Sequence, residues 1–467
     1  MTTTTNTISA FTDDCLSNYD TVGLVEQLNA RQVSSEELVN AAIIRAEKVN
    51  PELNAIVVKA YKEAQSESKC PRSGAFSGVP TFVKDSDDVE GLVTVVGSAA
   101  IKLSKAKKDS SFVKQLRQVG LVNIGKSAMP EFGLTGSTEA LSLGPTLNPW
   151  NIDYTPGGSS GGATALVASG VVSIAHANDG AGSIRIPASC CGLVGLKPTR
   201  GRTALVDGSR VLPVNILHQG VVTRTVRDTA AFYEALEQRP GKQTLPAIGR
   251  VSSPGKKRIK VALVTDGADH ECSLAAEEAA RLLGNAGHNI EAIPLPFAKQ
   301  VSDDFFILWR LMAFGFQRFG SFFFGKGFDG NKTEPFTKNL NQDFTKQFLK
   351  APLAFRRLKK FSQEYAQFFT EYDCLLTPTL GHAPPKVGHL STAEPYDVCL
   401  DRIRKFFPYT PYQNISGAPA ITMPFMTSNA GLPIGVQFAG AWGQEKQLLE
   451  LAYEFEEISN WKHLFER

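Results

Sequence analysis

The sequence predicts one large α/β domain, and two patterns along the chain support this class. Short apolar runs separated by glycine follow residue 78, as expected of buried strands, at 79–83, 92–96, 121–124, 171–175 and 193–196, with a helical stretch at 111–119. Further on, an apolar run at 259–264, a helical pattern at 273–286 and a second apolar run at 290–293 indicate a β-α-β unit at a sheet edge. Alternating strands and helices are therefore expected along most of the chain.

The chain begins with a helical part. Ser34 and Glu37 have the spacing of a capping box, and apolar residues recur at helical intervals from there until Pro51. A second distinctive stretch, residues 305–328, holds nine phenylalanines and Trp309, interrupted by arginines and glycines that argue against a membrane span. This phenylalanine-rich segment favours a buried helical hairpin, with an aromatic wall of a substrate site or a surface-binding cap as alternatives.

The composition is that of a globular protein without a strong overall field. The 467 residues are 42% hydrophobic and 20% charged, and no internal repeat divides them, so one continuous domain is expected. The 49 basic and 46 acidic residues nearly cancel, which does not favour nucleic acid, an anionic membrane or a highly acidic partner. A small-molecule substrate fits this balance better. The stretch 238–257, rich in Pro, Lys and Gly, predicts a surface loop.

The seven cysteines predict no disulfide framework, because their number is odd and no CxxC pair occurs. They are expected to be reduced packing residues, and no metal site is expected. Residues 1–10 carry neither a basic segment nor an apolar core, and no uninterrupted apolar run of about 18 residues occurs elsewhere. We therefore expect a cytoplasmic protein without a membrane span. Its oligomeric state stays open, with a homodimer among the options.

Two hydroxyls in small-residue turns and a distant lysine are the parts of a serine hydrolase that uses lysine as its base. Ser183 ends the turn 180–183, Ser159 lies in the glycine run 157–162, and Lys84 closes the predicted strand 79–83. Small residues in such a turn let backbone N–H groups approach and stabilise an oxyanion. Burial of Lys84 would disfavour its charged form and make it a base.

Each of these features has an alternative interpretation. An ordinary ion pair with Asp85 or Asp87 is the alternative for Lys84. His176 follows an apolar run, and this setting is more typical of a packed core residue than of a base. The two glycine runs approach nucleotide-binding patterns, but Ala163 replaces the phosphate-binding lysine of one, and Arg185 replaces the final glycine of the other. No nucleotide cofactor is therefore expected.

The chain resembles the amidase signature family over about residues 20–455. The resemblance rests on ordered motifs at 78–85, 144–162, 179–199, 373–378, 414–419 and 431–437. It implies a single domain with a central mixed, largely parallel twisted sheet flanked by helices. Within it, a helical N-terminal part would cover about 18–70, the signature core about 75–205, and a more variable substrate-side part about 205–400.

The same resemblance implies roles for individual residues. Ser183 matches the acylated nucleophile, Ser159 the middle serine with a cis peptide bond, and Lys84 the base. The implied proton route runs from Ser183 to Ser159 to Lys84, with a covalent acyl-enzyme and no cofactor. The backbone of the nucleophile turn matches the oxyanion hole, formed by Gly180, Ala181, Gly182 and Ser183. Three further residues match supporting positions: Ser160, Asp179 and Arg185.

Within the family, Ala181 and its flanking residues resemble the branch of 6-aminohexanoate cyclic-dimer hydrolases, which shares the alanine. The phenylalanine-rich segment has no cysteine, whereas that hydrolase has a functional one in the matching region. The implied activity is hydrolysis of a small or hydrophobic, linear or cyclic amide. Two other functions are compatible with the fold: a transamidating subunit acting on misacylated transfer RNA, and a catalytically inactive binding protein.

Overall fold

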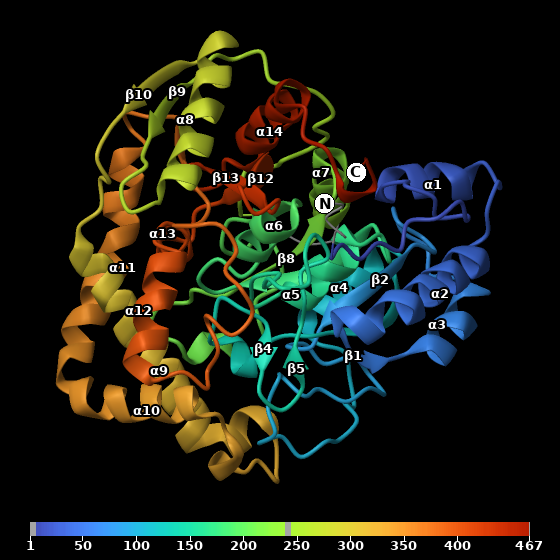
Figure 1. Cartoon of the computed structure of the whole chain (residues 1–467), viewed down its shortest axis with the longest axis horizontal. Helices are drawn as coiled ribbons and strands as arrows, with labels where there is room; N and C mark the ends of the chain where they lie inside the picture. Colours follow the sequence, from blue (N-terminus) through green and yellow to red (C-terminus); the bar gives the residue numbers. More distant parts are fainter. Residues whose placement is uncertain (1–5, 239–243, 467) are drawn as a thin grey trace, which may run out of the picture.

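The computed structural model describes residues 6–238 and 244–466, and its centre is an eight-stranded mixed sheet (Figure 1). The strands follow one another across the sheet as β10 (Asn289–Ala292), β9 (Lys260–Leu263), β11 (Cys374–Pro378), β13 (Pro433–Ala439), β12 (Ala420–Thr427), β7 (Val194–Lys197), β8 (His218–Thr223) and β6 (Ile174–Asp179). The expected single α/β domain with a mixed sheet is confirmed. The β-α-β unit is also present: β9, α8 (His270–Asn285) and β10 form a parallel pair at one edge.

The expectation of a largely parallel sheet is wrong for the described strands. Within the described residues of the eight-stranded sheet, β10 with β9 and β9 with β11 pair in parallel, whereas the other neighbours run antiparallel. The apolar runs predicted burial on both faces, which indicates covering helices but does not set strand direction. Strands β12 and β13 show the difference: a short connection joins them, and short connections give antiparallel neighbours.

A smaller three-stranded sheet lies beside β6 and carries the predicted lysine. It is formed by β1 (Ile56–Lys59), β3 (Val122–Ser127) and β2 (Pro80–Lys84), with β2 and β3 parallel. The predicted strand 92–96 is an irregular segment, because Val96 and its neighbour Gly97 adopt left-handed φ angles of 47° and 67°. A further short pair is β4 (Glu139–Ala140) with β5 (Gly144–Pro145).

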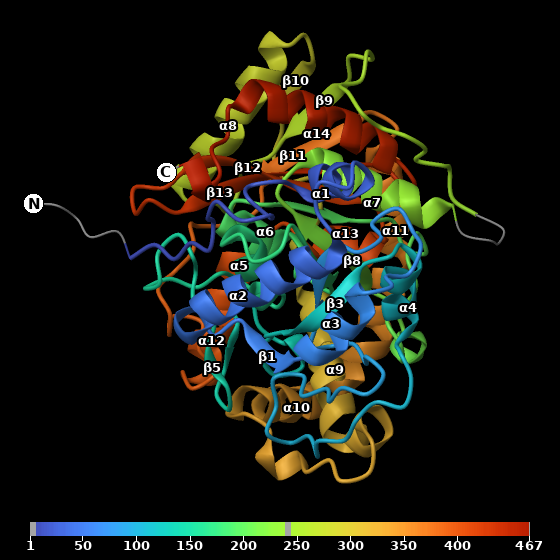
Figure 2. The same cartoon turned by 90° about the vertical axis from the view of Figure 1, so that its right-hand side faces the viewer.

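Helices cover both faces of the main sheet (Figures 1 and 2). On one face lie α7 (Val226–Glu237), α8 and α14 (Glu445–Ser459), and on the other lies α6 (Arg185–Cys191), which packs against β7, β12 and β13. The N-terminal part is helical as predicted, with α1 (Thr21–Asn29), α2 (Ser35–Leu53) and α3 (Tyr61–Ser68). The capping box is present, since the side chains of Ser34 and Glu37 each accept the other residue's backbone N–H. The remaining short helices here are α4 (Ser111–Gln118) and α5 (Gly161–Ala168).

The phenylalanine-rich segment forms helix α9 (Lys299–Phe324), which is kinked at Phe319, rather than a helical hairpin. Neither Gly315 nor Gly320 ends the helix, although the backbone leaves helical geometry at Phe319 (φ −123°, ψ 22°), and the chain then turns at Gly325 and Gly327, which have left-handed φ angles. Helix α9 packs against α10 (Pro335–Gln347) and α11 (Ala351–Phe368), with α12 (Tyr396–Phe406) and α13 (Pro411–Ser416) nearby on the same side of the molecule. Among the described residues no helix is long and apolar enough to cross a membrane.

The cysteines and the loop near residue 250 also agree with the predictions from the sequence. All seven cysteines are free, and five of them are buried, as expected of packing residues. The predicted loop 238–257 is irregular over residues 244–257, while residues 239–243 lie outside the described part of the chain.

Candidate active site

Lys84 lies at the end of β2 and contacts three groups that come from elsewhere in the chain. Its Nζ atom lies 2.7 Å from Oγ of Ser159, 2.9 Å from Oγ of Ser160 and 2.6 Å from Oδ1 of Asn178. The peptide bond between Gly158 and Ser159 is cis. Parallel pairing of β2 with β3 and packing of β2 against β6 bring the lysine to this point.

Burial lowers the pKa of Lys84. Its side chain is fully buried, and the resulting loss of hydration lowers the pKa of Lys84 to about 7, although the carboxylates of Asp179 and Asp87 act in the opposite direction. The alternative of an ion pair with Asp85 does not hold, because Asp85 pairs with Lys126 at 2.9 Å. A substantial fraction of Lys84 is thus neutral near pH 7.

His176 is a structural residue, as predicted. Its Nδ1 accepts the backbone N–H of Lys84 at 3.1 Å, so the ring hydrogen lies on Nε2, which donates to Oε1 of Gln219 at 2.8 Å. Burial lowers the pKa of His176 and favours this neutral form. Both ring nitrogens are therefore occupied, and the ring fixes the backbone beneath the lysine.

Counting donors and acceptors assigns the proton positions around a neutral Lys84. Asn178 Nδ2 donates to Oγ of Ser86 at 2.8 Å, which leaves Asn178 Oδ1 facing the lysine as an acceptor. The Ser160 hydroxyl donates to the carbonyl oxygen of Asn178 at 3.3 Å, so it too accepts from Nζ. A neutral amine has two hydrogens and one lone pair. Both hydrogens are used by Asn178 and Ser160, and the lone pair faces the hydroxyl of Ser159.

Ser183 lies in the turn between β6, which ends at Asp179, and α6, which begins at Arg185, and it lines the same cavity as Ser159. Gly182 gives the turn its shape: its φ is 124°, and a Cβ there would lie 2.4 Å from Oγ1 of Thr410. Any other residue would therefore be strained and would collide with the neighbouring loop. The requirement for a small residue in this turn thus has a steric cause.

The expected role of Gly182 in the oxyanion hole needs a correction. Its N–H donates to Oδ1 of Asp179 at 2.7 Å and is not free for a substrate oxygen. The backbone N–H groups of Gly180, Ala181 and Ser183 have no acceptor within the described residues. Gly180 and Ser183 also line the cavity, so their N–H groups are available as donors there.

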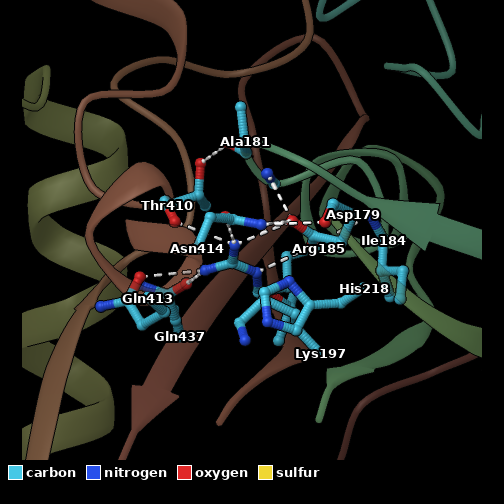
Figure 3. Close-up of polar contacts among 12 residues, drawn as sticks. Asp179, Ala181, Ile184, Arg185, Lys197, His218, Thr410, Gln413, Asn414 and Gln437 are labelled. Carbon is cyan, nitrogen blue, oxygen red and sulfur yellow. Dashed lines mark hydrogen bonds and ion pairs between the residues drawn. The ribbon is translucent and has the colours of Figure 1, made fainter. Parts of the chain in front are cut away.

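Beneath the turn, Asp179 and Arg185 form a buried ion pair that joins distant parts of the chain (Figure 3). Arg185 contacts both carboxylate oxygens of Asp179 at 3.0 Å, and its remaining donors reach four groups that are far away in sequence: Oε1 of Gln413, the carbonyl of Thr410, Oδ1 of Asn414 and Oε1 of Gln437. Burial alone would raise the pKa of Asp179, but the charge and hydrogen bonds of Arg185 outweigh burial and hold that pKa well below its usual range. The predicted supporting residues thus hold the nucleophile turn through a full set of hydrogen bonds.

A cavity of about 840 Å³ opens over the serines. Ser159, Asn178, Gly180 and Ser183 lie on its floor side, and α9 contributes a wall of aromatic and aliphatic side chains: Trp309, Leu311, Met312, Phe314, Phe316, Phe319, Phe322, Phe323 and Phe324. The phenylalanine-rich segment therefore lines the same cavity as Ser159 and Ser183. The described residues contain no group of three or more His, Cys, Asp or Glu side chains placed to hold a metal ion.

Sequence reasoning missed two residues of the site. The sequence marks Asn178 only as a neighbour of the nucleophile turn, although it alternates with His176 along β6 and period-two spacing places both on the face toward β2. Phe132 has a left-handed φ of 52°, and its ring stacks on Phe324 with centroids 5.0 Å apart. Only Gly133 beside it indicates an unusual turn.

Comparisons with known proteins show the family of the chain. Residues 37–449 match the family described as Amidase. A protein of Mycobacterium leprae, provisionally named amidase AmiC, is 43% identical over 462 residues, covering 98% of each chain. The 6-aminohexanoate-cyclic-dimer hydrolase of Pseudomonas sp. (strain NK87) is 33% identical over 475 residues, covering 95% of each.

Solved structures give the same family. A 6-aminohexanoate cyclic dimer hydrolase complexed with substrate superposes with a TM-score of 0.87 at 29% identity, covering 97% of this chain and all of that one. A bacterial aryl acylamidase of the amidase signature family reaches 0.82 at 25% identity, covering 95% and 96%. The resemblance to the cyclic-dimer hydrolase branch is thus confirmed, with AmiC more similar in sequence. The chain belongs to the amidase signature family and is a hydrolase of amide C–N bonds.

Proposed function

We propose that the chain hydrolyses an amide with a bulky apolar acyl group through an acyl-enzyme on Ser183, with Ser159 relaying the proton and Lys84 as the base. One observation carries this proposal: the buried Nζ of Lys84 lies 2.7 Å from Oγ of Ser159, in a cavity that Ser183 also lines. A lysine with a pKa of about 7 accepts a proton at neutral pH far more readily than an exposed lysine.

The proton route follows from the hydrogen-bond count at Lys84. The lone pair of neutral Nζ accepts the Ser159 proton, and Ser159 in turn accepts the proton of Ser183 as Ser183 Oγ bonds to the amide carbon. When the C–N bond breaks, Ser159 donates a proton to the leaving amine and regains one from Lys84. Water then repeats the same steps on the ester, releasing the acid and restoring Ser183.

Three backbone N–H groups support the negative charge that develops on the carbonyl oxygen. Gly180, Ala181 and Ser183 offer free donors, whereas the N–H of Gly182 holds the turn to Asp179. Loss of one such donor typically costs about 3 kcal/mol of transition-state stabilisation. The hydrogen bond from Gly182 contributes indirectly, because it fixes the positions of the other three.

The wall of the cavity supports the choice of acyl group. Phe132, Phe316 and Phe324 pack around one another beside the serines, with ring centroids 5.0 to 5.4 Å apart. Such a surface gains free energy by covering an aryl or alkyl group and gains little from a short polar one. The cyclic dimer of 6-aminohexanoate, after which one of the similar proteins is named, has an alkyl chain on its acyl side and fits this description.

The experiment is a panel of amides with acetyl, hexanoyl, benzoyl and cyclic acyl groups, assayed with acid quenching and intact mass measurement. The proposal predicts turnover that favours the larger apolar groups and a mass increase equal to the acyl group, both absent in Ser183→Ala. Turnover by Ser183→Ala at the wild-type rate would contradict it. Preference for the acetyl amide would contradict the part that concerns the acyl group.

A further inference from the structure

Solvent-exposed apolar side chains lie at the mouth of the cavity. Leu103, Val211, Phe319 and Phe322 are 60%, 60%, 58% and 77% exposed. Val211 and both phenylalanines line the cavity itself, and Leu103 lies between two lining residues. Exposed aromatic residues gathered at one opening mark an interaction site more often than chance exposure.

Basic side chains lie in the same segments as these apolar ones. Five exposed cations lie in the same segments, and within the described residues none of them forms an ion pair: Lys102, Lys105, Arg210, Arg318 and Lys326. Two exposed acids, Asp88 and Asp207, also line the cavity, and they accept hydrogen bonds from Thr94 and Ser111. The local balance is thus positive although the whole chain carries only +3.

The three segments form one continuous surface. The N–H of Asp329 donates to the carbonyl of Ala100 at 2.9 Å, and a Cβ on Gly327 would lie 2.6 Å from Cδ of Lys102. The loop at 206–211 approaches Phe323, to which a Cβ on Gly208 would lie at 3.9 Å. In Figures 1 and 2 the loop near residue 100 lies beside the C-terminal end of α9 at the bottom of both views. We call residues 102–105, 207–211 and 318–326 the docking rim.

We propose that the docking rim binds the surface of an anionic lipid bilayer, with Phe319 and Phe322 inserted among the acyl chains and the surrounding lysines and arginines on anionic headgroups. Exposed apolar side chains with unpaired cations close to them in the chain suit such a surface, because headgroup charge lies next to the apolar layer of the bilayer. The cavity opens through the rim, so an apolar amide dissolved in the bilayer reaches Ser183 without crossing water. This interaction goes beyond amide hydrolysis and does not depend on it.

The test is co-sedimentation of Ser183→Ala protein with vesicles, so that turnover plays no part. Binding is expected to phosphatidylcholine vesicles that contain about 30 mol % phosphatidylglycerol, to weaken with added salt, and to be at least about ten-fold weaker with phosphatidylcholine alone. The double variant Phe319→Ser/Phe322→Ser and the charge variant Lys105→Glu/Arg318→Glu should each lose about ten-fold in affinity. Phe348→Ser/Leu349→Ser is the matched control: these residues are 56% and 80% exposed outside the rim, and their replacement should leave binding unchanged.

Several results would overturn the proposal. They are equal binding to neutral and anionic vesicles, equal loss in the control variant, or binding of a single-chain anionic amphiphile without binding of vesicles. Self-association through the rim, seen as a dimer in sedimentation velocity that the Phe319→Ser/Phe322→Ser variant abolishes, would replace the lipid surface by a second copy of this chain. Because acyl-enzyme formation is measured separately in wild-type protein, failure of vesicle binding leaves the proposed reaction standing, and failure of acylation leaves the docking rim standing.

Discussion

Lys84 loses its proton readily because its ammonium group is buried and its three hydrogen-bond partners are uncharged. Removing water from an ammonium group favours the neutral amine, and a hydroxyl or amide returns less stabilisation than a carboxylate would. The nearby Asp85 is neutralised by Lys126 instead. The pKa of Lys84 therefore depends on which cations the nearby carboxylates pair with.

This dependence predicts the pH profile of the enzyme. Below pH 7 Lys84 carries a proton and has no lone pair for Ser159, so kcat/KM should rise with pH and level off above the pKa of about 7. The measurement is kcat/KM for a neutral amide from pH 5 to 9. A profile that is flat across pH 7 would contradict a lysine base.

Asn178 offers a sharper test at the same scale. In Asn178→Asp a carboxylate would face Nζ in place of an amide oxygen 2.6 Å away, which favours the charged lysine. The acid limb of kcat/KM should move up by about 1 to 3 pH units, because that is the usual effect of an adjacent opposite charge. Asp87 and Asp179 also face Lys84 but are unchanged, so they do not confound the shift.

Asn331→Asp, at an exposed position, is the matched control and should leave the profile in place. A purely structural role for Asn178 would lower kcat without moving the limb. That outcome would remove Asn178 from the positioning of the base.

At this scale the sequence predicted Lys84, Ser159 and Ser183, because two hydroxyls in small-residue turns and a lysine at the end of a buried strand are typical of one kind of hydrolase. It did not predict that Gly182 bonds to Asp179, since hydrogen-bond direction within a turn depends on dihedral angles that composition does not reveal. The alternation of Asn178 with His176 could have placed both side chains on one face of the strand. The contact of Asn178 with Lys84 could not be predicted in this way, because Lys84 is 94 residues away in sequence.

At the scale of elements, α9 is the helix that lines the cavity. One stretch of the helix, from Trp309 to Phe324, supplies much of the wall, and packing on α10 and α11 holds its other side. The sequence showed the aromatic content but could not decide between a buried hairpin and a cavity wall, because a phenylalanine-rich helix has the same pattern whether it faces a core or a cavity. The missing hairpin has a similar cause: glycine permits a turn without requiring one.

Shortening the wall should change specificity. Phe316→Ala is expected to weaken kcat/KM for a benzoyl or hexanoyl amide about 10- to 100-fold, because lost apolar contact of this size is worth about 1 to 3 kcal/mol. The acetyl amide should change much less, since it does not reach the ring. Steady-state kinetics with both substrates measure the ratio, and equal losses for the two would show that the wall does not contact the acyl group.

At the scale of the whole molecule, Arg185 connects parts of the site that lie more than 200 residues apart in sequence. It bonds Asp179 under the nucleophile turn, Asn414 and Gln413 on α13, and Gln437 on β13. The motifs near 179–185, 414–419 and 431–437, which are separate along the chain, are one buried cluster. The direction of the strands in the main sheet is also a property of the whole molecule. Apolar runs could not predict it, because strands that are buried on both faces have the same sequence pattern whether they are parallel or antiparallel.

Removing this connection should destabilise the fold and not only the site. Arg185→Met would leave the buried Asp179 carboxylate without its partner, which typically costs about 3 to 5 kcal/mol. Urea denaturation measures the loss at pH 7. Arg281→Met, which breaks an exposed ion pair with Glu278, is the control and should cost less than about 1 kcal/mol. Similar small losses in both variants would mean that the cluster does not hold the molecule together.

The most direct test of the proposed Lys84, Ser159 and Ser183 relay is the rate at which a fluorophosphonate labels the protein, followed by peptide mass spectrometry across pH 5 to 9. We expect a single adduct on Ser183, a rate that rises through an ionisation near pH 7, and loss of at least about 100-fold in Lys84→Ala and in Ser159→Ala. An adduct in Ser183→Ala protein, or an unchanged pH profile in Lys84→Ala, would contradict the relay.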